Sequence, residues 1–241
     1  MLYANDLISN FKIPARKNAI GFCPYCNAQM IPKCGAVKIH HWAHKQKECS
    51  DTWYEPETQW HLNWKSHFPM EDTEVLIKNK DAIHIADYFN KTKNYVIEFQ
   101  NSSLSLFDKI ERETFYPNLI WVINVKNKSG FEFEFEKIIQ NNLVKTFRWK
   151  HPIQWVVKEF RHDIIYLIDN FPGDGKLFKI INIEHDEGYD FVSVGYNEYY
   201  THYHKVYISG IVYTKNFVIP GSVQIFFDTL NDTIAQRRLT I

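Results

Sequence analysis

The pattern of apolar and polar residues predicts four strands in the middle of the chain. Short runs rich in β-branched and aromatic residues, separated by polar residues, are typical of strands. Three such runs are 74–78, 82–89 and 95–100, and the polar residues 90–94 join the last two as a hairpin. The uninterrupted apolar run 119–125 predicts a strand buried in the centre of a mixed sheet.

Helical spacing marks the segments that flank the first three strands. Residues 55–68 have a proline in the first turn and two tryptophans four residues apart, which favours a helix. Residues 104–115 follow an Asn-Ser-Ser segment that can cap a helix, and Leu106, Ile110 and Phe115 give this helix an apolar face. We therefore expect an α/β fold with an α+β mixed sheet, in the order αβββαβ.

The C-terminal half of the chain gives weaker signals. Residues 131–136 alternate phenylalanine and glutamate as a strand would, but 137–145 has helical spacing and predicts a helix. Apolar runs at 164–168 and 177–183 predict a hairpin with its turn at 172–175. The expected parts are an N-terminal module (1–50), a core (51–150) and a β-rich C-terminal extension (151–241).

Length and composition exclude a collagen-like, low-complexity or largely disordered protein. The chain has 241 residues, of which 45% are hydrophobic and 23% charged, as in a globular protein with its own core. The longest apolar run is far shorter than the roughly 18 residues that cross a membrane, so no membrane partner is expected. The N-terminus lacks the basic and apolar pattern of a signal peptide, and we expect a cytoplasmic protein.

The charge is balanced overall but not along the chain. Lys plus Arg and Asp plus Glu both number 28. Residues 1–50 carry seven basic and two acidic residues, whereas residues 51–125 carry 7 basic and 12 acidic residues. A basic module beside an acidic segment suits a part that binds phosphates and a part that binds divalent cations. Charge fluctuations of this size also occur without any such function.

Two close pairs of metal-ligand residues lie near the N-terminus. The segment Cys23-Pro-Tyr-Cys26 is followed, after fourteen residues, by His41-Trp-Ala-His44. Two pairs of soft and borderline ligands can surround one Zn²⁺ tetrahedrally. Cys23, Cys26, His41 and His44 are therefore predicted to hold a structural zinc ion.

Other residues compete for these four positions. His40 could replace either histidine, and Cys34 or Cys49 could take a ligand position. The His-x-x-His spacing is shorter than in common zinc fingers, so a helix that reads a DNA groove is not implied. The alternative is a set of reduced thiols and surface histidines without metal, and a disulfide framework does not suit a cytoplasmic protein.

Acidic and basic residues on the first predicted helix share one side of it. Glu57, His61 and Lys65 recur every four residues, which places them along one face. An ordinary solvent-exposed helix shows the same pattern.

The predicted hairpin brings two carboxylates together. If its turn is centred between residues 92 and 93, paired positions sum to 185 and Asp87 lies opposite Glu98, with Cβ atoms about 5 Å apart. Gln100 lies on the same face as Glu98 because side chains alternate along a strand. Paired carboxylates repel each other unless a proton or a cation lies between them, and Mg²⁺ prefers such ligands. We therefore predict a Mg²⁺ or Mn²⁺ site, whereas a one-residue register shift would leave Asp87 in solvent.

Together, these motifs resemble the CoiA-like competence protein family over roughly residues 20–125. The family combines a Cys-Pro-x-Cys segment, a His-Phe-Ala-His-like element, a Glu-x-x-x-His-x-x-x-Lys helix, an Ala-Asp strand, a Glu-x-Gln-Ser-like strand and an Arg-x-x-x-Tyr helix. The matching residues here are Cys23 to Cys26, His41 to His44, Glu57 with His61 and Lys65, Ala86-Asp87, Glu98 to Ser102, and Arg112 with Tyr116.

The resemblance implies a nuclease core of the PD-(D/E)xK type with a small N-terminal zinc module. It implies phosphodiester hydrolysis on DNA, in DNA uptake, recombination or defence. Asp87 and Glu98 would be the metal ligands and Glu57 an additional acidic residue of the first helix. Arg112 and Tyr116 are expected to contact the substrate, and His61 is expected either to contact it or to stabilise the helix face.

One departure from the superfamily pattern concerns its lysine. Gln100 stands where that superfamily has a lysine, as the family pattern allows, and a glutamine cannot supply positive charge to a transition state. Lys65 is the candidate replacement, with Lys109 as a weaker one. Gln100 would instead orient a water on the metal.

Two further functions fit the same residues. One is a non-catalytic DNA-binding accessory protein, of use in recombination or competence, that keeps a nuclease scaffold without its lysine. The other is an adaptor whose zinc module binds another protein, such as a recombination protein. The sequence does not reveal the oligomeric state.

Overall fold

The computed structural model describes most of the chain. The described residues are 1–45, 49, 53, 57–80, 82–116, 118–125, 131–139, 142–150, 152–169, 176–194, 197–214 and 222–238. Only the backbone is described for 131–139, 142–146, 184–194, 197–207, 209–212, 214 and 233–238. The predicted helix start at 55–56 and the predicted turn at 172–175 lie outside the described residues.

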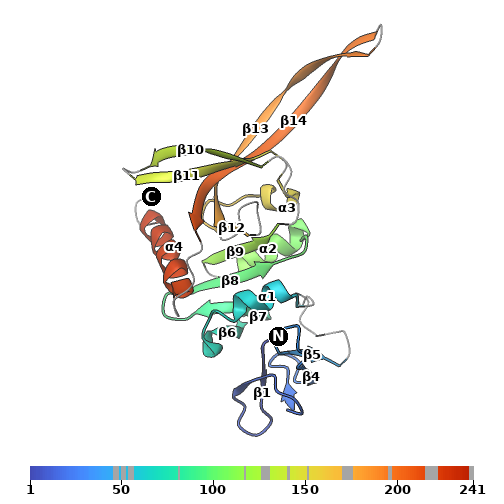
Figure 1. Ribbon diagram of the computed structural model, residues 1–241, viewed down its shortest axis with the longest axis vertical. Helices are drawn as coiled ribbons and strands as arrows, with labels where there is room; N and C mark the ends of the chain where they lie inside the picture. The colour runs from blue at the N-terminus through green and yellow to red at the C-terminus, as the bar shows by residue number, and fades with distance from the viewer. Residues whose placement is uncertain are drawn as a thin grey trace. The chain divides into compact units, whose positions relative to one another are not determined.

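The fold is mixed α+β, as the sequence predicts, and consists of two compact units (Figure 1). Unit 1 comprises 1–101, 113–122 and 216–241, and unit 2 comprises 102–112 and 123–215. Unit 1 thus combines the N-terminal segment with the end of the chain, which the sequence pattern assigns to the C-terminal extension. None of the helices in the described part of the chain is long and apolar enough to span a membrane.

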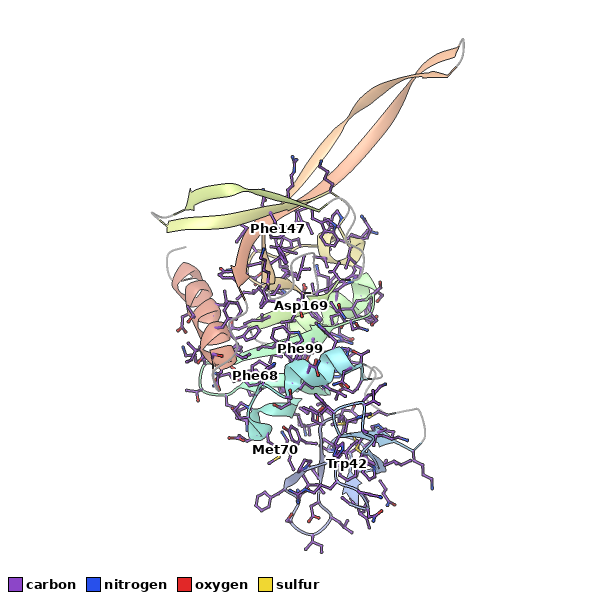
Figure 2. All side chains as sticks on the ribbon, viewed as in Figure 1. Trp42, Phe68, Met70, Phe99, Phe147 and Asp169 are labelled. Atoms are coloured by element: carbon purple, nitrogen blue, oxygen red, sulfur yellow. The ribbon has the colours of Figure 1, made fainter. Side chains whose placement is uncertain are left out.

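The N-terminal part of unit 1 is a small antiparallel sheet in the order β2-β1-β3-β4-β5. Its strands are β1 (Tyr3–Asn5), β2 (Lys12–Pro14), β3 (Gly21–Phe22), β4 (Gln29–Lys33) and β5 (His41–His44). Trp42 is 1% exposed and is the largest side chain of this core (Figure 2). A Cβ atom at Gly21 would lie 2.7 Å from the Ala4 Cβ and 2.9 Å from the Trp42 ring, so this position requires a glycine.

The elements between residues 59 and 124 follow the predicted order of helix, three strands, helix and strand. They are α1 (Gln59–Lys65), the 3₁₀ helix η1 (Met70–Asp72), β6 (Thr73–Lys78), β7 (Ile83–Asn90), β8 (Tyr95–Gln100), α2 (Leu106–Phe115) and β9 (Leu119–Asn124). The four strands lie in the order β9-β8-β7-β6, and β7 pairs antiparallel with both neighbours β6 and β8. Tyr88 pairs with Ile97 and Asn90 with Tyr95, which is the predicted register.

Helix α1 begins later than the sequence predicts. Thr58 is its N-cap, and a capping box joins Thr58 to His61, so Glu57 lies before the helix rather than on it. A side-chain cap that satisfies the first free amides fixes the start more strongly than a proline does.

Aromatic side chains hold α1 and the C-terminal helix α4 (Ser222–Arg238) on the strands. Trp64 stacks on Phe99 with ring centroids 5.5 Å apart, and the ring centroids of Phe68 and Tyr88 lie 4.3 Å apart. From α4, Phe227 contacts both Trp64 and Phe68. The C-terminal segment therefore completes the core of unit 1.

Helix α2 does not bury the face that its apolar residues predict. Leu106 is 36% exposed and Ile110 is 44% exposed, whereas Lys109, Arg112 and Glu113 are buried. Lys109 donates to two backbone carbonyl oxygens, and Glu113 Oε1 accepts a hydrogen bond from the Trp121 indole at 3.1 Å. Buried polar side chains that are paired in this way can replace an apolar stripe.

Unit 2 is built on strands in the order β10-β11-β14-β13-β12. They are β10 (Phe131–Ile139), β11 (Asn142–Trp149), β12 (Ile165–Asp169), β13 (Lys176–Val194) and β14 (Asn197–Thr214), with the short α3 (Gln154–Val157). The predicted helix over 137–145 is wrong, because β10 and β11 pair as an antiparallel hairpin through this segment. Its β-branched Ile and Val residues favour a strand once a partner strand is present. The predicted pairing of the runs near 164–168 and 177–183 is observed between β12 and β13.

Candidate functional site

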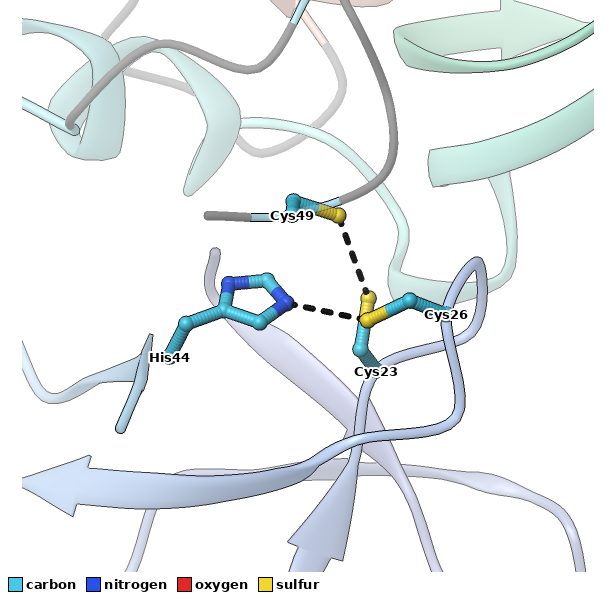
Figure 3. Close-up of side chains that lie close together, drawn as sticks. All are labelled: Cys23, Cys26, His44 and Cys49. Atoms are coloured by element: carbon cyan, nitrogen blue, oxygen red, sulfur yellow. Dashed lines mark hydrogen bonds between the residues drawn. The ribbon is translucent and has the colours of Figure 1, made fainter. Parts of the chain in front are cut away.

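Three cysteines and one histidine converge on one point of the N-terminal sheet. Cys23 and Cys26 lie in the turn between β3 and β4, His44 ends β5, and Cys49 follows it (Figure 3). One ligand atom from each lies within 4.8 Å of all the others. The Cys26 Sγ is 3.4 Å from His44 Nε2, and the Cys23 Sγ is 3.9 Å from the Cys49 Sγ. This Cys₃His group could bind a metal such as zinc.

The fourth member of the Cys₃His group is Cys49 and not the predicted ligand His41. His41 and His44 are three apart on β5, so the alternation of side chains puts them on opposite faces of the sheet. His41 Nδ1 instead lies 2.9 Å from the Ile39 carbonyl oxygen. The prediction that His41 and His44 bind the same metal ion is therefore wrong, and Cys49 completes the group.

The protonation of the cluster suits a metal that displaces protons. Burial raises the pKa of Cys23 to about 12, so without metal this thiol keeps its proton. Burial also lowers the pKa of His44, which favours the neutral imidazole that ligates metals. Binding of a metal would release the thiol protons.

A second cluster is centred on the ammonium group of Lys65, at the end of α1. Its side chain is 3% exposed, and its Nζ lies 2.5 Å from Glu57 Oε1, 2.8 Å from Asp87 Oδ1 and 3.2 Å from Glu74 Oε1. The structure therefore brings together the predicted residues Lys65, Glu57 and Asp87. Glu57 reaches Lys65 from the segment before the helix. We call Lys65, Glu57, Glu74, Asp87 and Glu98 the carboxylate cluster.

Asp87 and Glu98 meet across the β7–β8 hairpin. The Asp87 amide donates to Glu98 Oε1 at 3.3 Å, and the Phe99 amide donates to Asp87 Oδ2 at 2.9 Å. Each carboxylate thus bonds a backbone amide of the opposite strand, and this holds the two acidic groups side by side. Gln100, two residues beyond Glu98 and on the same face of β8, is 2% exposed.

Glu74 is a member of this cluster that the sequence does not point to. It is 1% exposed, with a backbone φ of 53°, a conformation that is uncommon for residues other than glycine. Its carboxylate also accepts hydrogen bonds from the amides of Leu2 at 2.8 Å and Tyr3 at 3.0 Å. Glu74 opens an apolar run with no spacing relation to the other acidic residues, so only the folded chain shows its role. Backbone strain of this kind is concentrated at functional sites.

The electrostatics of the carboxylate cluster favour an added cation. Burial alone would raise the pKa of Glu57, but the attraction of Lys65 outweighs it and holds the pKa at about 2. Burial alone would lower the pKa of Lys65, but Asp87, Glu57 and Glu74 hold it well above its usual range. Glu57 is therefore expected to be ionised, and Lys65 protonated, near neutral pH.

The balance of charge in this cluster stays negative. The Met1 amino group lies 3.6 Å from Glu57 Oε1, and even with this group counted beside Lys65 the four carboxylates exceed the cations by two. In the described part of the chain, no hydrogen-bond donor reaches the buried Glu57 Oε2. A buried carboxylate oxygen of this kind, beside further carboxylates, suits a divalent cation.

Comparison with known proteins identifies the N-terminal segment. The family model for "Competence protein CoiA, N-terminal domain" matches residues 9–51. The chain carries a CoiA N-terminal domain. This match supports the CoiA-like competence protein family for the chain and implies a competence-related role. The matched segment includes the whole Cys₃His group and ends before the carboxylate cluster. No curated protein and no solved structure matches the chain.

The CoiA N-terminal domain contacts the segment that carries Glu74. Lys12 Nζ donates to the carbonyl oxygens of Thr73 at 2.5 Å and Met70 at 3.2 Å. Ile85, two residues before Asp87, packs against the core of the domain that contains Cys23. The domain is therefore joined to the strands of the carboxylate cluster.

The other predicted site residues are buried and have structural contacts. His61 is 7% exposed, and its Nδ1 accepts from the Thr58 amide in the capping box, so it stabilises the start of α1. Lys109 donates to the carbonyl oxygens of residues 158 and 159, both at 2.7 Å, and is not part of the carboxylate cluster. Arg112 and Tyr116 are 5% and 3% exposed, so neither offers much surface to a substrate in this structure.

Proposed function

We propose that this protein is a metal-dependent deoxyribonuclease that hydrolyses phosphodiester bonds in DNA, in uptake, recombination or defence. The observation that carries the proposal is the meeting of Lys65 with Glu57, Glu74 and Asp87 beside Glu98. A lysine among several carboxylates is the combination that phosphoryl transfer needs: ligands for a cation, and a positive charge for the phosphate.

In this proposal Asp87 and Glu98 hold Mg²⁺ or Mn²⁺. The ion would polarise the scissile phosphate and lower the pKa of a bound water. Lys65 would donate a hydrogen bond to a phosphate oxygen and stabilise the charge that develops there. Gln100 would accept a hydrogen bond from the attacking water and orient it, while Glu57 and Glu74 hold the Lys65 ammonium in place.

Divalent-metal affinity tests this site without relying on cleavage. Titration of the zinc-loaded protein with Mn²⁺, followed by electron paramagnetic resonance, should show a site whose affinity falls at least about tenfold in Glu98→Gln, because a neutral amide is a poorer ligand. The exposed Glu71 provides the control Glu71→Gln, which should bind like the wild type. Equal Mn²⁺ affinity of Glu98→Gln and the wild type would show that Glu98 does not bind the cation, and would contradict the proposed site.

The second candidate is a non-catalytic DNA-binding accessory protein of recombination or competence. Gln100 in place of the lysine of the superfamily pattern favours it, since Lys65 then balances buried carboxylates and has no catalytic role. Absence of Mn²⁺ binding together with DNA binding would support this function.

We also propose that the Cys₃His group holds a structural zinc ion. His44→Asn should abolish the bound zinc and destabilise the N-terminal sheet, because three thiolates cannot complete the tetrahedral group. His41→Asn is the matched control and should keep the metal, since His41 lies outside the group. Zinc content by atomic absorption and the thermal unfolding midpoint measure both effects. Loss of zinc in His41→Asn but not in His44→Asn would show that His41, and not His44, is the histidine ligand.

A further inference from the structure

An apolar loop projects from the N-terminal sheet between β1 and β2. Leu7 is 69% exposed, Ile8 94% and Phe11 75%, and all three lie within five consecutive residues. Single exposed apolar side chains are ordinary on protein surfaces, but three on one short loop form a patch that suits a partner.

The loop is held in one conformation by its own hydrogen bonds. Asp6 Oδ1 accepts from the amide of Ile8 at 3.1 Å and from the amide and hydroxyl of Ser9, both at 2.9 Å. The Asp6 amide donates to the Phe11 carbonyl oxygen, and the Asn10 amide donates to the Asp6 carbonyl oxygen. Because the backbone is already fixed, the apolar side chains are presented with little further loss of conformational entropy on binding.

Both ends of the loop are attached beside the carboxylate cluster. Tyr3, three residues before Asp6, donates its amide to Glu74, and Lys12, directly after Phe11, donates to the Thr73 carbonyl oxygen. Three residues of strand span about 10 Å. The base of the loop therefore lies within reach of any nucleic acid bound at the carboxylate cluster.

The N-terminal segment that carries the loop is basic. Residues 1–45 contain six basic residues and one acidic residue, Asp6, whose carboxylate bonds its own loop. The exposed basic side chains are Arg16, Lys17, Lys33, Lys38 and Lys45. Basic side chains with a projecting apolar group are the features of proteins that contact phosphates and insert a wedge between base pairs.

We propose that loop 6–11 binds duplex DNA, with Ile8 and Phe11 inserted against a base step while basic side chains of the same N-terminal segment contact phosphates. This proposal rests on the proposed function, because it takes the DNA substrate as the partner. An anionic membrane surface also attracts basic and apolar side chains. The attachment of the loop beside Glu74 favours DNA, since the partner of the carboxylate cluster must then lie next to the loop.

The test is DNA binding measured without added divalent metal, so that cleavage plays no part. The zinc-loaded protein is titrated into a fluorescein-labelled duplex, and Ile8→Ser combined with Phe11→Ser should weaken binding at least about tenfold, through loss of the buried apolar area. Val37, which is also 94% exposed, gives the control Val37→Ser, which should bind as the wild type does. These residues are on the surface, so the variants should fold normally.

Two readouts separate the outcomes. A duplex that contains 2-aminopurine should gain fluorescence with the wild type, from unstacking of the base, and not with the double variant. Unchanged DNA binding in the double variant would overturn the proposal, and so would an absence of DNA binding by the wild type. Loss of binding to phosphatidylglycerol vesicles, with DNA binding intact, would assign the loop to a membrane surface. The Mn²⁺ titration described above tests cation binding at the carboxylate cluster independently of the loop.

Discussion

Replacing Asp87 with asparagine is expected to lower the rate of DNA cleavage by about 10³-fold. The substitution keeps the shape of the side chain and an oxygen that can accept from the Phe99 amide. It removes the charge of a proposed metal ligand and one of the ionic partners of Lys65, and in the proposed mechanism both groups stabilise charge in the transition state. Single-turnover cleavage of a labelled duplex in Mn²⁺ measures the effect.

The control for Asp87→Asn is Asp232→Asn. Asp232 is an exposed residue of α4 that pairs with Lys93 at 2.7 Å, and its loss should leave the cleavage rate unchanged. If Asp87→Asn cleaves at the wild-type rate and remains folded, the reaction takes place at another site.

Replacing Lys65 with methionine is expected to lower the free energy of unfolding by about 3–5 kcal/mol at neutral pH, because it leaves buried carboxylates without their counter-ion. The control Lys93→Met removes an exposed ion pair and should leave the free energy of unfolding nearly unchanged. Urea unfolding followed by tryptophan fluorescence measures both values. Equal stability of Lys65→Met and the wild type would show that Lys65 does not neutralise the cluster.

The cost of losing Lys65 should depend on pH. The pKa of Glu57 is lowered from 4.5 to about 2 in the folded protein, so its ion pair stabilises the fold fully above pH 4.5. This contribution is lost as the pH falls toward 2. The difference in stability between the wild type and Lys65→Met should therefore narrow over this range.

The register of the β7–β8 hairpin could be predicted from local sequence patterns alone. A polar tip between two apolar runs was enough to predict that Asp87 lies beside Glu98, because a hairpin fixes its own pairing. The order of helices and strands through β9 follows from the same kind of local signal. The N-terminal cysteine pair is predictable because its two ligands lie in one turn.

The parts that the sequence does not predict depend on distant partners. Glu74 acquires its role only when Leu2 and Tyr3 supply two backbone amides and α1 supplies Lys65. His41 and His44 look equivalent in the sequence, and only the strand conformation of β5 separates them. Segment 137–145 has helical spacing but pairs as a strand. No pattern considered above predicts α4, although Phe227 packs in the core of unit 1.

The most direct test of the central claim is cleavage of linear, circular and single-stranded DNA by the zinc-loaded wild-type protein, with and without Mg²⁺ or Mn²⁺. The carboxylate cluster predicts cleavage of at least one of these substrates that requires the added ion. Intact DNA on every substrate, from protein that is folded and binds DNA, would contradict the nuclease and favour the accessory function.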